Sequence, residues 1–298
     1  MEAPMFQVIV PATTANLGPG YDCIGMAIGL SMTIDVARAD TWSVRYDNEE
    51  YRELPHDETN LIVRTIQKVA EEKQVEATPL ALIVSTDIPL GKGLGSSASA
   101  IVAGIAIANE AYQLDIPVSE QLRLATTYEG HADNANAALL GGLVFSYYDG
   151  ETLDVAQLPA PEMDILLLVP EGSLATEESR SVLPKSLPHD KATSGSAAGT
   201  VLAAAFASND LTLAGRMIER DTFHEPYRKK MFIHFDAIRH RANELGAYAM
   251  TISGAGPSLI VFTPLDKTKD IALRLAREYD EYTVIETTPS AHGVLVKD

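Results

Sequence analysis

Cysteine is nearly absent from this chain of 298 residues, in which Cys23 is the only one. A single cysteine can form neither an intrachain disulfide nor a cysteine cage for a metal, and such a composition suits a reducing compartment. Basic residues are also scarce, because 23 Lys and Arg stand against 41 Asp and Glu, which gives a formal net charge of -18. A field of this sign repels nucleic acid and anionic lipid, so we expect neither as a partner.

Long apolar runs are missing too. The longest apolar stretch, Ala98–Ala108, is interrupted by Ser99 and Gly104, and it falls short of the roughly 20 residues that cross a bilayer. The first residues have neither a basic segment nor a long apolar segment, so they do not predict a signal peptide. We therefore expect a cytoplasmic protein without a membrane partner. Hydrophobic residues still make up 46% of the chain, enough for a substantial core.

Strand and helix patterns alternate irregularly along the chain, which favours an α+β fold over a doubly wound sheet. The first strand is expected to end before Pro11, where a polar loop begins. Ser119 is expected to cap a helix over 119–129, and Gly246 to close another. Apolar patterns predict strands over 5–10, 80–89, 141–148 and 165–170, a strand–turn–strand unit over 246–264, and further helices over 59–72, 97–112, 194–210, 210–221 and 232–246.

Turn residues cluster between residues 149 and 164, in the segment DGETLDVAQLPAPEMD. The chain is long enough for two smaller domains that share an interface. This composition therefore predicts a boundary near residue 155, which divides the chain into domains 1–155 and 156–298.

A glycine-rich loop stands between a predicted strand and a predicted helix, in the stretch IPLGKGLGSSASA from Ile88 to Ala100. Glycines allow consecutive backbone N–H groups to turn inward, and a helix that begins near Ser96 adds unpaired N–H groups and the positive end of its dipole. The pattern predicts an anion site for phosphate. The spacing is neither that of a Walker motif nor that of a dinucleotide fingerprint. For this loop alone, a tight turn capped by serine remains the alternative.

Three further segments accompany this loop, and together the four resemble the motifs of the GHMP kinases. PLGKGLGSSASA, Pro89–Ala100, is similar to the second motif, and SGAGPS, Ser253–Ser258, to the third. VPATTANLGPGYDCIGMAI, Val10–Ile28, resembles the first motif in the form found in homoserine kinases. YEGHADNANAALLGGLV, Tyr128–Val144, resembles the segment that carries a magnesium ligand and a substrate ligand there, with HADN in place of HPDN and NANA in place of NVAP. The four motifs stand in the family's order.

This resemblance implies an S5-like N-terminal domain and a ferredoxin-like C-terminal domain, with the site between them. It also implies ATP, Mg²⁺ and, as in many family members, a homodimer. The implied reaction transfers the γ-phosphoryl group of ATP to the side-chain hydroxyl of L-homoserine. Two alternatives stay open: a GHMP kinase for another acceptor, such as mevalonate or a sugar, and a non-catalytic relative that senses a ligand.

The nucleotide and metal ligands follow from the same resemblance. Ser97 and Glu129 are the expected magnesium ligands and catalytic residues, although the sequence does not separate Ser96 from Ser97 as the metal ligand. Lys92 could add positive charge beside the triphosphate, and Asn60 is expected at the adenine. The expected ATP-binding residues are Asn60, Pro89, Leu90, Gly91, Lys92, Gly93, Leu94, Gly95, Ser96, Ser97, Ala98, Ser99, Ser253 and Gly254.

The substrate ligands are implied in the same way. Arginine offers a planar fork of donors that suits a carboxylate, and an aspartate suits an ammonium group. Thr176 either contacts the transferring group or caps the helix that carries Arg180, and the cap is the simpler interpretation. Taken alone, each arginine would more often form a surface ion pair. The expected substrate ligands are Asn16, Asp22 for the ammonium, Asn134, Thr176, and Arg180 and Arg228 for the carboxylate, with Arg180 also counted as catalytic.

Overall fold

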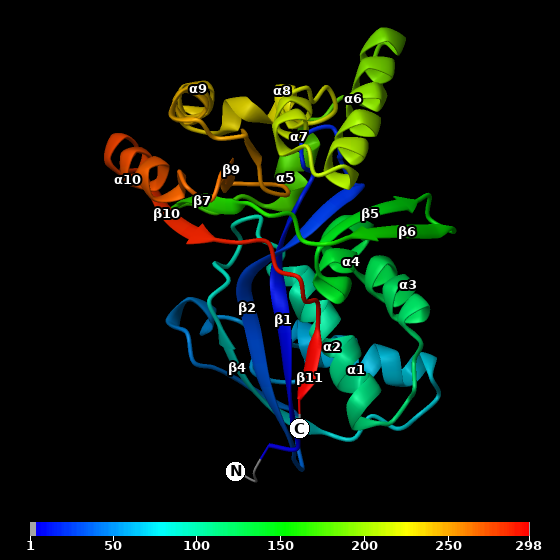
Figure 1. Ribbon diagram of the computed structural model, residues 1–298. Coiled ribbons are helices and arrows are strands. Elements are labelled where there is room, and N and C mark those ends of the chain that lie inside the picture. Colours follow the sequence, from blue (N-terminus) through cyan, green and yellow to red (C-terminus); the bar gives the residue numbers. More distant parts are fainter. Residues whose placement is uncertain (1–3, 298) are drawn as a thin grey trace.

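Two β-sheets organise the chain, of which the computed structural model describes residues 4–297 (Figure 1). The first sheet has the strand order β11-β1-β2-β4-β3, and β5 and β6 extend it through β2. Its strands are β1 (Phe6–Ala15), β2 (Ile24–Arg38), β3 (Ser43–Tyr46), β4 (Leu80–Thr86), β5 (Leu143–Tyr148), β6 (Leu153–Leu158) and β11 (Leu295–Lys297). The second sheet has the order β10-β7-β9-β8, built from β7 (Asp164–Pro170), β8 (Ala249–Ile252), β9 (Leu259–Thr263) and β10 (Tyr282–Thr287). The predicted α+β fold is confirmed.

The helices divide between the two sheets. Those that gather beside the first sheet in Figure 1 are α1 (Leu61–Glu72), α2 (Ser96–Ala111), α3 (Val118–Glu129) and α4 (Ala132–Leu140). Those that follow β7 along the chain are α5 (Thr176–Ser181), α6 (His189–Ala207), α7 (Leu211–Ile218), α8 (Glu225–Arg228), α9 (Phe235–Leu245) and α10 (Thr268–Glu278). Two short 3-10 helices are η1 (Glu49–Tyr51) and η2 (Lys229–Met231).

Helix α2 is the centre of the larger core. Every residue from Ala98 to Ala108 is buried, and the helix packs against β1, α1, α3 and α4. A helix that is apolar all round is buried inside a domain. The small side chains of α2 allow its neighbours to pack closely on every side. The N-terminus of α2 is therefore held in a fixed position, and the glycine-rich loop leads directly into it.

Two local predictions are wrong. Strand β1 continues past Pro11 to Ala15, with a shift of the β1–β2 register between Pro11 and Ala12. A proline lacks the N–H that a regular ladder needs, and an irregularity of register accommodates it. Helix α3 begins after Pro117, and in the described part of the chain no side chain caps it, so Ser119 is not its cap. Gly246, by contrast, ends α9 with a φ of 94° as expected.

The chain crosses between the sheets more than once. It leaves the first sheet after Leu158, enters the second at Asp164, and returns to the first with β11. Residue 155 itself lies within β6, which pairs with β5. The division into 1–155 and 156–298 stays a prediction.

Among the described residues, no helix is long and apolar enough to span a membrane.

Candidate active site

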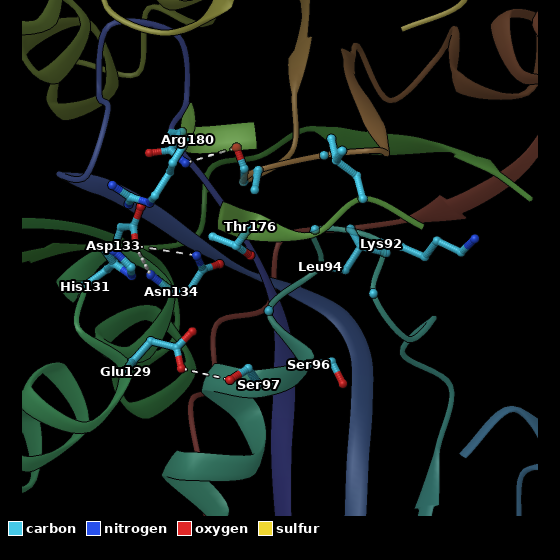
Figure 2. Close-up of a pocket in the computed structure, with 18 of the residues that line it drawn as sticks. Lys92, Leu94, Ser96, Ser97, Glu129, His131, Asp133, Asn134, Thr176 and Arg180 are labelled. Atoms are coloured by element: carbon cyan, nitrogen blue, oxygen red, sulfur yellow. Dashed lines mark hydrogen bonds between the residues drawn. The ribbon is translucent and has the colours of Figure 1, made fainter. Parts of the chain in front are cut away.

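One pocket of about 240 Å³ collects residues from all four sequence motifs (Figure 2). Its lining includes the glycine-rich loop, the N-terminus of α2, the end of α3, the start of α4, helices α5 and α8, and the turn between β8 and β9. The predicted residues that line it are Asn16, Leu90, Gly91, Lys92, Gly93, Leu94, Gly95, Ser96, Ser97, Glu129, Asn134, Thr176, Arg180, Arg228 and Gly254.

The glycine-rich loop has a backbone that other residues would not readily adopt. Gly91, Gly93 and Gly95 have φ values of 67°, 73° and 73°. A Cβ on Gly95 would lie 1.9 Å from Thr13 Oγ1, and one on Gly93 would lie 2.5 Å from the Ser253 carbonyl oxygen. The loop thus needs glycine both for its turn and for close contact. Helix α2 starts at Ser96, and among the described residues no side-chain hydrogen bond caps it, so its first backbone N–H groups are available to an anion.

The third motif braces this loop from the second sheet. Ser253 Oγ, which is buried, donates to the Gly93 carbonyl oxygen at 2.8 Å and lies 2.9 Å from Thr14 Oγ1. The Gly254 N–H donates to the Ala15 carbonyl oxygen at 3.0 Å. Ser253 therefore supports the loop without lining the pocket, whereas Gly254 lines it.

Lys92 does not direct its charge at the anion site. Its ammonium donates to the carbonyl oxygens of Pro170 and Gly172, both at 2.8 Å, and to that of Glu171. Figure 2 shows the side chain extending away from the labelled group of pocket residues. The expectation that Lys92 neutralises the triphosphate is not met in this conformation. Its side chain instead ties the loop to the end of β7.

Ser97 and Glu129 face each other, with Ser97 Oγ donating to Glu129 Oε2 at 3.0 Å (Figure 2). Burial raises the pKa of the Glu129 carboxyl, and the hydrogen bond from Ser97 opposes this rise. Ser96 is engaged elsewhere, since its Oγ lies 2.9 Å from the Tyr51 hydroxyl. The structure thus separates the two serines, and Ser97 is the one beside a carboxylate.

The opposite end of the pocket contains both arginines. Arg180 forms two hydrogen bonds with Asp22, of 2.6 Å and 3.2 Å. Arg228 is fully buried, and its Nε donates to the Ser179 carbonyl oxygen at 3.0 Å. Asn16 accepts the Asp22 N–H at 2.8 Å and donates to the Gly254 carbonyl oxygen at 3.0 Å. Asp22 itself lies in a neighbouring surface groove, in contact with the pocket through Arg180.

Thr176 lines the pocket and is not a cap. It is the first residue of α5, after Ala175, and within the described residues no side-chain hydrogen bond caps this helix. The interpretation of Thr176 as a cap is wrong, and its hydroxyl is left on the pocket wall.

Comparison with known proteins decides the family. Residues 60–142 match the GHMP kinases N terminal domain, and residues 202–281 match the GHMP kinases C terminal domain. A homoserine kinase of Bacillus cereus (strain G9842) is 42% identical over 290 residues, which cover 97% of this chain and 96% of that protein. The chain belongs to the homoserine kinase family of the GHMP kinases.

Solved structures agree with this assignment to the homoserine kinases. The crystal structure of homoserine kinase from Cytophaga hutchinsonii has a TM-score of 0.87 at 28% identity, covering 99% of this chain and 98% of that one. A structure from Listeria monocytogenes has a TM-score of 0.86 at 35% identity, covering 98% and 99%. The two-domain fold implied by the motifs is thereby confirmed.

Several residues of this chain were not predicted at the site. Tyr21 lies under both arginines, with its ring centroid 5.4 Å from Arg180 Cζ and 5.3 Å from Arg228 Cζ. His224 is buried, and its Nε2 lies 3.0 Å from the carbonyl oxygens of Asn16 and Gly18. Because carbonyls only accept, Nε2 carries the proton. Aromatic and histidine side chains at these positions gave no signal of their own in the sequence.

Asp133 is a third residue that was not predicted at the site. It is 1% exposed, lines the pocket, and accepts the Asn134 N–H on Oδ1 at 2.7 Å. Burial, with a contribution from the charge of Asp22, raises the pKa of this carboxyl to about 7. His131 also lines the pocket.

Some predicted ATP ligands lie beside the pocket without lining it. Ala98 and Ser99 are buried, and Ser99 Oγ donates to the Pro11 carbonyl oxygen at 2.8 Å. Pro89 is not among the lining residues of the described chain. Asn60 caps α1 by accepting the Ile62 N–H at 2.9 Å, and its amide also donates to Tyr46 and Pro55. Its place at the adenine stays a prediction.

Proposed function

We propose that the chain transfers the γ-phosphoryl group of ATP to the side-chain hydroxyl of L-homoserine, giving O-phospho-L-homoserine in threonine biosynthesis. The observation that carries this proposal is the 42% identity with a homoserine kinase over nearly the whole chain. The geometry supports it, because one end of the pocket offers backbone N–H groups for phosphate and the other offers Arg180 and Arg228 for a carboxylate. The cytoplasmic location and the homodimer stay predictions.

The nucleotide would lie across the glycine-rich loop. A second cavity, of about 260 Å³, shares Leu90, Ser96 and Ser97 with the pocket and has Tyr51 and Leu54 in its wall. A largely apolar wall next to a phosphate site suits a purine base. We therefore assign the adenine to this second cavity and the triphosphate to the loop and the N-terminus of α2.

The donor set beside the loop fits Mg²⁺. Ser97 Oγ and Glu129 Oε2 are hard oxygen ligands 3.0 Å apart, and Mg²⁺ commonly takes one or two protein ligands together with phosphate and water. Among residues 4–297, no group of three or more His, Cys, Asp and Glu could hold a metal by itself. A bound Mg²⁺ would neutralise charge on the phosphoryl oxygens, and Ser97 and Glu129 would hold it there.

The acceptor would occupy the arginine end. Arg180 and Arg228 would bind its carboxylate and Asp22 its ammonium, while Asn16 holds the backbone of Asp22 in place. Asn134 would contact the hydroxyl. Phosphoryl transfer has a loose transition state, so these residues act mainly by placing the hydroxyl oxygen in line with the γ-phosphorus and by balancing charge. The hydroxyl oxygen forms the new P–O bond as the bond from the γ-phosphorus to the bridging oxygen breaks, ADP leaves, and the hydroxyl proton is released to solvent.

A coupled assay of ADP release tests the proposal. Mg-ATP is supplied with L-homoserine, mevalonate, galactose or L-threonine in parallel, and turnover is expected with L-homoserine alone. Turnover with another acceptor would keep the nucleotide site and reject the assignments of Asp22, Arg180 and Arg228. ATP binding without any turnover would favour the ligand sensor.

Two variants locate the metal in the same assay. Ser97→Ala is expected to raise the Mg²⁺ concentration needed for half-maximal activity, because it removes one of two protein ligands. Ser196→Ala, on the exposed face of α6, is the matched control and should leave this concentration unchanged.

A further inference from the structure

Thr13 connects the phosphate end of the pocket with Asn134. It lies on β1 and is fully buried. Its N–H donates to the Leu94 carbonyl oxygen at 3.1 Å, and its Oγ1 donates to Asn134 Oδ1 at 2.8 Å. The same hydroxyl occupies the space that a side chain on Gly95 would need. One residue of a buried strand therefore contacts the glycine-rich loop and the start of α4 together.

The neighbours of Asn134 fix which way its amide points. Asp133 Oδ1 accepts the Asn134 backbone N–H at 2.7 Å and lies 3.4 Å from Asn134 Nδ2. An amide turned the other way would bring its oxygen against this carboxylate oxygen, which is already an acceptor. It would also lose the Thr13 hydroxyl as a donor to its oxygen. With Oδ1 committed to Thr13, the group that remains for a ligand in the pocket is the Nδ2 donor.

We propose that Thr13 is a positioning residue for phosphoryl transfer, acting through Asn134. Its hydroxyl holds the Asn134 amide so that Nδ2 donates a hydrogen bond to an oxygen in the pocket, that of the acceptor hydroxyl or of the transferring phosphoryl group. Because the Thr13 N–H donates to the Leu94 carbonyl oxygen, the Asn134 Nδ2 donor keeps a fixed position relative to the glycine-rich loop. The inference rests on the proposed function, whose reaction supplies that oxygen.

Thr13→Val tests the hydroxyl alone. The substitution keeps the shape and the backbone N–H to Leu94, so the affinity for ATP, measured by titration, should change less than about twofold. Loss of the hydrogen bond frees the Asn134 amide, and kcat with L-homoserine should fall about tenfold. Thr13→Ser restores the hydroxyl and should return kcat to within about twofold of the wild type.

The chain offers a closely matched control. Thr126 Oγ1 donates to Asn136 Oδ1 at 3.2 Å, and both residues are buried. This is also a threonine hydroxyl bound to an asparagine of α4, but neither residue lines the pocket. Thr126→Val should lower the midpoint of thermal unfolding and leave kcat within about twofold of the wild type.

A double-variant cycle separates positioning from general stability. In an Asn134→Ala background, adding Thr13→Val should change kcat by less than about twofold, because Thr13 acts through Asn134. An additive loss would overturn the inference, and so would a wild-type kcat in folded Thr13→Val. If Thr13→Val does not fold, Thr13→Ala carries the same expectations. If the wild type itself does not turn over L-homoserine, the proposed function fails, and this inference fails with it.

Discussion

Asp22 and Arg180 form a bidentate ion pair between the pocket and the neighbouring surface groove, with Arg180 Nη2 2.6 Å from Asp22 Oδ1 and Nη1 3.2 Å from Oδ2. Asp22 belongs to the loop after β1, and Arg180 to α5. These are the two side chains assigned to the opposite charges of an amino acid. In this structure each side chain neutralises the charge of the other.

A zwitterion can replace this ion pair by two new ones, whereas a ligand with a single charge cannot. 4-Hydroxybutyrate would leave Asp22 unpaired, and 3-aminopropanol would leave Arg180 unpaired. We expect the KM of each to exceed that of L-homoserine by at least about 100-fold, since an unpaired, partly buried charge costs roughly 3 kcal/mol. Equal KM values for 4-hydroxybutyrate and L-homoserine would exclude Asp22 from the ammonium site.

Gly95→Ala should severely impair ATP binding, and Gly91→Ala should not. Both glycines have a positive φ, so both variants bear a backbone cost of about 1 to 2 kcal/mol. At Gly95 the new Cβ would also lie 1.9 Å from Thr13 Oγ1, whereas at Gly91 the nearest atom, Ser173 Cβ, is 3.5 Å away. Calorimetric titration with ATP measures the difference. Similar affinities for the two variants would contradict the close packing of Thr13 on the loop.

Lys92→Met should act on stability more than on ATP binding. Lys92 is 8% exposed and its ammonium donates to three carbonyl oxygens. Their loss should lower the free energy of unfolding by about 3 kcal/mol in urea titrations. Lys73→Met, which removes a surface pair with Glu120, is the control and should cost under about 1 kcal/mol. A large rise in the KM for ATP at unchanged stability would instead indicate that Lys92 contacts the phosphates of ATP.

Asp133→Asn should stabilise the protein increasingly as the pH rises from 5 to 8. The folded carboxyl has a pKa of about 7, whereas an unfolded aspartate ionises near pH 4, roughly its ordinary value. Between these values the folded state binds the extra proton, so stability falls as the pH rises. Asparagine does not ionise and avoids this loss.

Thermal unfolding at several pH values measures this effect. Asp190→Asn is the control, because Asp190 occupies the same second position in α6 that Asp133 occupies in α4, but is exposed. Its difference from the wild type should stay constant over this range. A constant difference for Asp133→Asn as well would show that its carboxyl is ionised throughout.

The parts of the fold that the sequence predicted are those with strong local patterns. The apolar residues before the glycine-rich loop predicted β4, and the apolar segment after Gly95 predicted α2. Gly246 predicted the end of α9. Strand β2 was not predicted, because Gly25 and Gly29 interrupt its pattern and its partners lie far along the chain. Register between distant strands is a tertiary property, and local residues do not encode it.

The site shows the same limit at the level of side chains. The motifs brought the right segments together, but they did not give the direction of each side chain. The Lys92 ammonium is bonded to carbonyl oxygens at the end of β7 and not directed at the anion site, and Thr176 lines the pocket without capping α5. Thr13 and His224 act through hydrogen bonds to residues more than a hundred positions away. Such bonds depend on how elements distant in the sequence pack together, which no single motif contains.

The pairing of β1 with β11 has a consequence for synthesis. Gln7 lies opposite Lys297, so a ribosome makes β1 long before it makes the partner strand β11. Until then, one edge of β1 has unpaired N–H and C=O groups, which can recruit strands from other chains. Contacts between such distant residues also form slowly, because a long loop must close first. We therefore expect the nascent polypeptide to be prone to aggregation until β11 emerges, and refolding yields to fall as protein concentration rises.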